Sequence, residues 1–174
     1  FEVRPFWIWL ILLHYIIAEM FQTFPGDKVP ASEATEFRVL YDKSNLYVGV
    51  WCFQKNLEEI TANAGNEAYA FDDDWVGVVL DTFHDKRNSY AFLVTPNSLR
   101  VEMLSNDNGH NQNLNWETVW TARCGIQDWG WAAELAIPFK SISFDDQAIK
   151  WGINIARSIK STNESINWAN GRPG

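Results

Sequence analysis

The amino-acid sequence predicts an all-β fold, and more closely an antiparallel β-sandwich of the immunoglobulin-like or jelly-roll type with about eight or nine strands. Three observations support this prediction. Short runs rich in β-branched and aromatic residues recur along the chain, polar turn residues separate them at regular intervals, and strands do not alternate with helical patterns. A chain of 174 residues is long enough to form one such domain with a substantial core.

The first regular element is a predicted hairpin. Residues 37–41 and 46–53 are β-rich runs on either side of the polar turn 42–45, which is typical of two antiparallel strands. Residues 54–74 are polar and rich in alanine, so we expect a long connection with a helical turn near residues 57–64. Long connections on sandwiches often contribute to function.

A second hairpin is predicted after this connection. Residues 75–80 form an apolar run, opened by three aspartates and closed by Asp81, and residues 90–94 resume the apolar character. The other predicted strands and their main connection then follow in order: a strand at 99–104, a polar loop at 105–115, and strands at 116–123, 129–137 and 151–159.

The first 20 residues form an atypical apolar segment. Residues 6–17 are interrupted only by His14, and this run is shorter than the roughly 20 residues that cross a bilayer as a helix. A buried terminal strand or helix and the core of a signal peptide are the two alternatives. We therefore expect the sandwich to occupy residues 21–174.

Composition restricts the classes of partner. The net charge is −8, with 14 basic and 22 acidic residues, which disfavours nucleic acid and anionic lipid. The ten tryptophans either fill the core or stack on sugars. The three histidines are scattered, and no GxSxG or HExxH motif occurs, so the sequence favours a binding domain over an enzyme.

Three buried or strand positions carry further predictions. Cys52 and Cys124 lie far apart in the sequence, and we expect two free thiols in strands, with a disulfide as the alternative. Arg157 lies in the middle of a predicted strand, where its charge must reach either the rim of the sandwich or a carboxylate partner. The sequence offers Glu134 in the preceding strand, and we expect an ion pair.

The aspartates around the second hairpin are candidate ligands for calcium, which takes carboxylate oxygens. Their spacing does not match an EF-hand, and a solvated turn is the alternative. The candidates are Asp72, Asp73, Asp74, Asp81 and Asp85. A second and weaker candidate group lies in the polar loop and consists of Asp107, Asn108 and Asn111.

Five segments in order give the chain a resemblance to a known family. They are QTFPGDKVPASEATEFRVLYDKSNLYVGVWCF, DDDWVGVVLDTFHDKRNSYAFLVTPN, NWETVW, GWAAELAIPFKSISF and WGINIARSIKSTNESINW. Residues 21–168 resemble the carbohydrate-binding module family 9-like domain. The similarity is greatest to the version at the N-terminus of Bacteroidetes outer-membrane proteins that continue into a C-terminal barrel.

The resemblance implies a binding site for an oligosaccharide or polysaccharide. In sugar-binding members two aromatic rings clamp a terminal sugar, and by position these rings would be Phe71 and Trp168. Polar side chains near the second ring fix the sugar hydroxyls, and here these would be Asn163, Glu164 and Asn167.

The resemblance also implies a non-catalytic accessory domain in the periplasm or at the outer membrane, associated with the cell surface and in some cases with a glycoside hydrolase. However, Gly77 and Leu93 stand where sugar-binding members carry an acidic and a basic side chain. The alternative is therefore a structural or protein-docking domain of an outer-membrane complex that has lost sugar binding.

Overall fold

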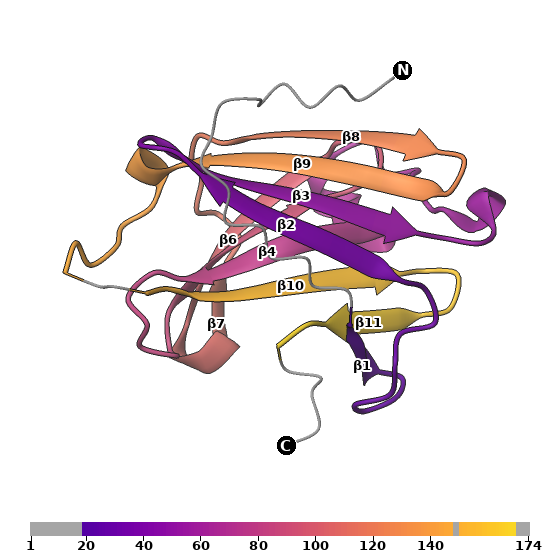
Figure 1. Cartoon of the computed structure of the whole chain (residues 1–174), viewed down its shortest axis with the longest axis horizontal. Helices are drawn as coiled ribbons and strands as arrows, with labels where there is room; N and C mark the ends of the chain where they lie inside the picture. Colours follow the sequence, from indigo (N-terminus) through magenta and orange to yellow (C-terminus); the bar gives the residue numbers. More distant parts are fainter. Residues whose placement is uncertain (1–18, 148–149, 170–174) are drawn as a thin grey trace.

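The computed structural model describes residues 19–147 and 150–169, which form two antiparallel sheets packed face to face (Figure 1). The seven-stranded sheet has the order β1 (Phe21–Phe24), β11 (Glu164–Asn167), β10 (Gly152–Ile159), β4 (Trp75–Asp81), β5 (Ser89–Val94), β6 (Arg100–Asn106) and β7 (Asn111–Asn113). The four-stranded sheet has the order β2 (Thr35–Tyr41), β3 (Asn45–Phe53), β9 (Gly130–Pro138) and β8 (Thr121–Gln127). The predicted all-β sandwich is confirmed.

The core lies between the two sheets and follows from the alternation of side chains along the strands. In β3, Leu46, Val48, Val50 and Cys52 are buried, while the residues between them are only partly buried. Successive side chains of a strand point to opposite faces, so this pattern directs one face of β3 into the core. The largest side chains that are almost fully buried include Phe37, Phe92 and Trp131.

A smaller apolar cluster covers the opposite face of the seven-stranded sheet. Ala91, Leu93 and Met103 are its buried members, and Trp75, Val79 and Val101 pack against them. These residues alternate along β4 and β5 with Val76, Val78, Phe92 and Val94, which belong to the main core. We call this second group the outer-face cluster.

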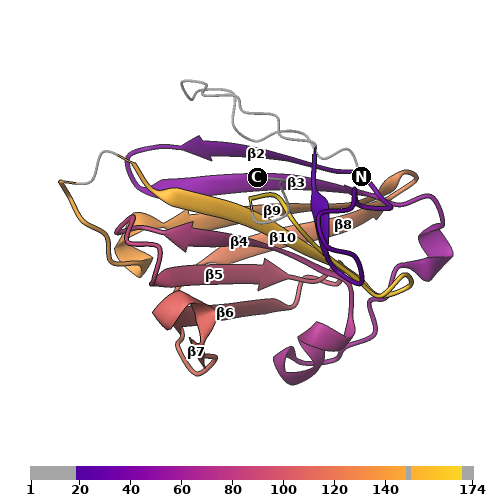
Figure 2. The same cartoon turned by 90° about the horizontal axis from the view of Figure 1, so that it is seen from below.

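The connection before β4 contains two short 3-10 helices, η1 (Leu57–Glu59) and η2 (Glu67–Asp72). The side chains of Asn56 and Asn66 cap them by accepting backbone hydrogen bonds from Glu58 and Ala68. The predicted long connection with a helical turn is therefore confirmed. Figure 2 shows this connection, in purple and magenta, at one end of the sandwich.

Three short strands were not predicted, and one boundary differs from the prediction. β1, β7 and β11 have three or four residues, and β7 consists of exposed Asn and Gln side chains within the predicted polar loop. That loop also contains a third 3-10 helix, η3 (Asp107–Gly109). Residues 116–120 are not a strand, because β8 begins at Thr121. Instead the buried Trp120 donates its indole N–H to Glu102 at 2.8 Å.

The apolar run 6–17, and with it the predicted boundary at residue 20, lies largely outside the described residues. Among the residues that are described, no helix is long and apolar enough to span a membrane.

Both cysteines are free thiols, as the sequence predicts. Burial raises the pKa of the Cys52 thiol to about 11 and that of the Cys124 thiol to about 12. The thiolate is the reactive form, so both groups should be almost unreactive near neutral pH. We expect slow labelling by a disulfide reagent at pH 8 in native buffer and rapid labelling of two thiols in denaturant. Rapid stoichiometric labelling of the folded domain would contradict this expectation.

Candidate functional site

Arg157 of β10 is fully buried at one end of the sandwich and has no exposed surface. Its Nη1 donates to the backbone oxygen of Ala34 and to Oγ1 of Thr35, both at 3.0 Å. Its Nη2 donates to the backbone oxygen of Phe53 at 3.0 Å and to Oε1 of Gln54 at 3.4 Å. The guanidinium group therefore joins the start of β2 to the end of β3.

The predicted ion pair between Arg157 and Glu134 is wrong. Glu134 lies in β9 and is exposed to solvent, so its side chain points away from the core that surrounds Arg157. The nearby negative charge comes from Asp74, which is 1% exposed and accepts a hydrogen bond from the backbone N–H of Lys160 at 2.7 Å. Burial raises the pKa of the Asp74 carboxyl, and the Lys160 hydrogen bond and the Arg157 charge oppose this shift.

A groove of about 770 Å³ lies at the same end of the sandwich. We call it the end groove and define it by Glu33, Phe53, Gln54, Asp128 and Trp129. The rings of Phe53 and Trp129 pack against each other with centroids 5.2 Å apart. This groove was not predicted from the sequence, although an aromatic residue ends the predicted strand 46–53 and another begins the predicted strand 129–137.

Phe71, the first predicted clamp residue, lies in η2 and is 36% exposed. Its ring meets the ring of Trp75 edge to face, with centroids 6.2 Å apart. Trp75 belongs to the outer-face cluster, so Phe71 extends this cluster beyond the end of β4. Together the two rings form a partly exposed aromatic surface.

Trp168, the second predicted clamp residue, follows β11 and packs against the main core. Its ring meets that of Phe37 in β2 edge to face at 5.7 Å. The seven-stranded sheet therefore lies between Trp168 and the Phe71–Trp75 surface. The structure does not bring the two predicted clamp rings together.

The three predicted polar partners also serve different purposes in the structure. Glu164 is buried, and its Oε2 accepts the backbone N–H of Ser32 at 3.1 Å. Asn167 donates its side-chain amide to Oγ1 of Thr23 at 3.3 Å, which links β11 to β1. Asn163 is exposed in the turn before β11 and has a φ of 53°.

Gly77 and Leu93 are direct cross-strand partners on the outer face of the seven-stranded sheet. A Cβ atom at position 77 would lie 2.8 Å from both Cγ of Leu93 and the backbone oxygen of Phe92. The leucine side chain thus occupies the space that a side chain at position 77 would need. The outer-face cluster is apolar where the resemblance implies charged anchors.

Gly77→Ala should destabilise the domain by about 1–3 kcal/mol, because the new methyl group overlaps a neighbouring side chain and a backbone oxygen. Denaturant unfolding monitored by fluorescence measures this change. A useful control is Gly49→Ala in β3, where the nearest contact is the movable ring edge of Trp51 at 3.3 Å. Equal stability of Gly77→Ala and wild type would show that the outer face has unoccupied space.

The predicted calcium ligands are separated by the length of β4. Asp72, Asp73 and Asp74 precede this strand, whereas Asp81 ends it, roughly 20 Å away for a strand of seven residues. Asp73 is buried and accepts the backbone N–H groups of Asn63 and Ala64 at 2.9 and 2.8 Å. The five aspartates therefore do not form one site. Within residues 19–147 and 150–169, no group of three or more acidic, His or Cys side chains is arranged to hold a metal ion.

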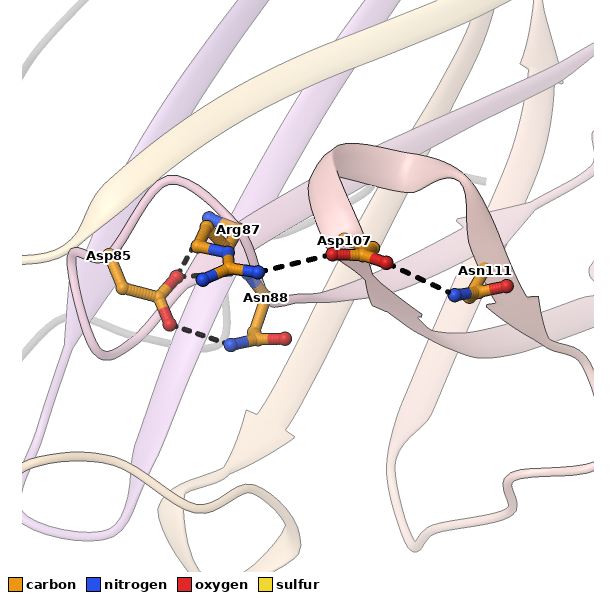
Figure 3. Close-up of polar contacts among 5 residues, drawn as sticks. All are labelled: Asp85, Arg87, Asn88, Asp107 and Asn111. Atoms are coloured by element: carbon orange, nitrogen blue, oxygen red, sulfur yellow. Dashed lines mark hydrogen bonds and ion pairs between the residues drawn. The ribbon is translucent and has the colours of Figure 1, made fainter.

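Beyond the far end of β4, Asp85 and the second candidate group with Asp107 and Asn111 lie on either side of Arg87 (Figure 3). Asp85 accepts backbone hydrogen bonds from Arg87 and Asn88. These hydrogen bonds, first that from Asn88 and then that from Arg87, lower the pKa of the Asp85 carboxyl. Nη2 of Arg87 contacts Oδ1 of Asp107 at 3.2 Å, and Asn111 donates to the other oxygen of Asp107 at 3.5 Å. A guanidinium group therefore already pairs with one carboxylate of this acidic surface. Both members of the ion pair are more than half exposed, so it contributes little to stability.

Two packed antiparallel sheets, with a partly exposed aromatic surface on one face and a groove at one end, define the class of protein, an antiparallel β-sandwich domain. A family model described as "Carbohydrate family 9 binding domain-like" matches residues 17–170. The chain therefore belongs to this family. The resemblance to the carbohydrate-binding module family 9-like domain is confirmed at the level of the family. No curated protein sequence matches the chain.

Solved structures with the same fold are consistent with this assignment. A candidate carbohydrate-binding protein from Bacteroides uniformis has a TM-score of 0.64 at 10% identity, over 88% of this chain and 77% of that one. A carbohydrate-binding module of family 9 from Caldicellulosiruptor kristjanssonii is similar in its complexes with glucose and with cellotriose. Both complexes have a TM-score of 0.58 at 13% identity and match 87% of this chain. The match covers 73% of the module in the glucose complex and 72% in the cellotriose complex.

Proposed function

We propose that this domain is a non-catalytic carbohydrate-binding module that binds a neutral oligosaccharide on the aromatic surface of Phe71 and Trp75. Membership of the carbohydrate family 9 binding domain-like family is the observation that supports this proposal most strongly. The module from Caldicellulosiruptor kristjanssonii, which has the same fold, is in complex with glucose and with cellotriose.

The chemistry of the surface is suited to a sugar. The C–H face of a sugar ring is apolar and stacks on aromatic planes, and the partly exposed rings of Phe71 and Trp75 offer such planes. Ser158 of β10 stands opposite Trp75, and Ser165 of β11 stands opposite Ser158. Residues directly opposite one another share a face of the sheet, so two hydroxyl groups lie on the side of Trp75, that of Ser158 largely buried and that of Ser165 partly exposed.

Isothermal titration with glucose, cellotriose and xylotriose tests the proposal. We expect saturable binding to at least one of them and a loss of about three- to tenfold in affinity for Phe71→Ala, because one stacking ring is removed. Tyr41→Ala is the matched control, since Tyr41 is 58% exposed at the end of β2 in the other sheet. Equal affinity of Phe71→Ala and wild type would place the sugar elsewhere.

The cellular setting belongs to the same proposal. We infer a periplasmic or outer-membrane location at the cell surface, within a longer protein that also carries a barrel or acts beside a glycoside hydrolase. Calcium binding is a separate part of this proposal, and since the five aspartates form no single site, it would need other oxygen ligands as well. Repeating the titrations with calcium and with a chelator tests it. A change in affinity or in the unfolding midpoint would support a calcium site.

A structural docking domain is the second candidate function. The apolar pair Gly77 and Leu93 favours it, because this pair replaces the charged anchors expected of a sugar-binding member. Absence of binding to all three sugars, together with recovery of the domain in a stable complex with an outer-membrane protein, would favour this candidate.

A further inference from the structure

We propose that the end groove is a second ligand site, distinct from the aromatic surface of Phe71 and Trp75, and that it binds a neutral, hydroxyl-rich saccharide. The groove opens where β3 and β8 end, on the right of Figure 1. Its lining comes from residues 19–21 at the start of β1, from the segment that leads into β2, from the end of β3 and from the turn between β8 and β9.

The floor of the groove is fixed by a buried arginine. Arg157 donates to four oxygen acceptors, and all four residues that carry them line the groove. They are Ala34, Thr35, Phe53 and Gln54. A buried cation costs free energy to desolvate, and a core that needed only stability would be served as well by apolar side chains. The guanidinium group instead holds the backbone under the groove in one arrangement.

Gln54 supplies an unused hydrogen-bond donor in this floor. Its side chain is only 4% exposed, and Arg157 contacts its Oε1. Among the described residues its Nε2 has no hydrogen-bond partner. A buried donor without an acceptor is costly, and a small movement of the Gln54 side chain toward the groove would let a hydroxyl or ring oxygen of a sugar satisfy it. A water molecule would also satisfy this donor, but it would not account for the aromatic pair beside it.

The walls of the groove complement a sugar in two further ways. Phe53 and Trp129 are both partly buried and offer apolar rings to C–H groups. Oε1 of Glu33 accepts the backbone N–H of Lys55 at 3.3 Å. The carboxylates of Glu33 and Asp128 can accept further hydrogen bonds from hydroxyl groups. Acidic side chains outnumber basic ones in the lining, so a neutral ligand fits better than an anionic one.

The test uses the ¹⁵N-labelled chain and cellotriose, followed through the indole N–H signals of Trp129 and Trp75. We expect saturable shifts of the Trp129 signal. Gln54→Glu keeps Oε1 as an acceptor for Arg157 but replaces the Nε2 donor with an acceptor oxygen. We expect this variant to bind cellotriose at Trp129 about tenfold more weakly, a loss of about 1.4 kcal/mol. The control is Gln112→Glu, which makes the same charge change on the exposed strand β7.

The two signals separate this proposal from the function proposed above. Shifts of Trp129 that weaken in Gln54→Glu but not in Gln112→Glu support the end groove, whatever Trp75 does. Shifts of Trp75 alone overturn the second site and leave the proposed function standing. If the Trp129 signal shifts with equal affinity in Gln54→Glu and wild type, the assigned role of Gln54 is overturned. If neither signal shifts up to tens of millimolar cellotriose, both proposals are overturned.

Discussion

Arg157→Met should destabilise the domain by about 3–5 kcal/mol. Methionine fills much of the same volume but cannot donate to the four oxygens that Arg157 now contacts. It also leaves the buried carboxyl of Asp74 without its nearby positive charge. Urea unfolding followed by tryptophan fluorescence measures the loss as a lower midpoint at unchanged slope.

Two further variants separate the buried charge from a general effect of removing arginine. Arg123→Met changes an exposed arginine of β8 and should alter stability by no more than about 0.5 kcal/mol. Adding Asp74→Asn to Arg157→Met should recover part of the loss, because the double variant no longer buries an unpaired charge. If Arg157→Met is as stable as wild type, the buried arginine does not hold this end of the sandwich together.

Gly130→Ala should cost about 3 kcal/mol or more, through backbone strain and steric overlap combined. Gly130 begins β9 with a φ of 142°, which side chains rarely allow. A Cβ atom there would overlap the backbone oxygen of Cys52 and lie 2.9 Å from the backbone nitrogen of Gln54. These are backbone atoms at the end of β3, so they cannot move aside as a flexible side chain would.

The expected damage includes the end groove, because Trp129 immediately precedes Gly130 and its backbone oxygen accepts from Gln54 at 3.1 Å. Thermal unfolding by circular dichroism checks the stability, and near-ultraviolet dichroism reports on the tryptophan environment. Gly125→Ala in the same hairpin is the matched control, since its nearest contact is the movable amide of Gln127 at 3.4 Å. Similar melting of the two variants would contradict the proposed overlap.

The fold was predictable from the sequence because its long strands carry a regular alternation. β3 buries every second residue, and the aromatic and β-branched composition of β4 and β5 leaves little choice of structure. The three short strands were not predictable. β7 joins the sheet through backbone hydrogen bonds while its Asn and Gln side chains are exposed, so no apolar period marks it.

The candidate sites were less predictable, because they depend on which face of a sheet a residue occupies. Sequence position alone suggested that Phe71 and Trp168 cooperate, but one ring lies with the outer-face cluster and the other packs on the main core. The end groove joins Glu33, Gln54 and Trp129, which are far apart in the sequence and meet only through strand register. Gln54 itself lies beyond the end of a strand, where composition carries no sign of its burial.

The structure of the domain crystallised with cellotriose would test the central claim most directly. We predict a sugar ring stacked on either Phe71 or Trp75, whose planes are nearly perpendicular, and within hydrogen-bonding reach of Ser158 or Ser165. A well-diffracting crystal grown at saturating cellotriose, with this surface open to solvent and no sugar bound to it, would contradict the account and favour the docking function instead.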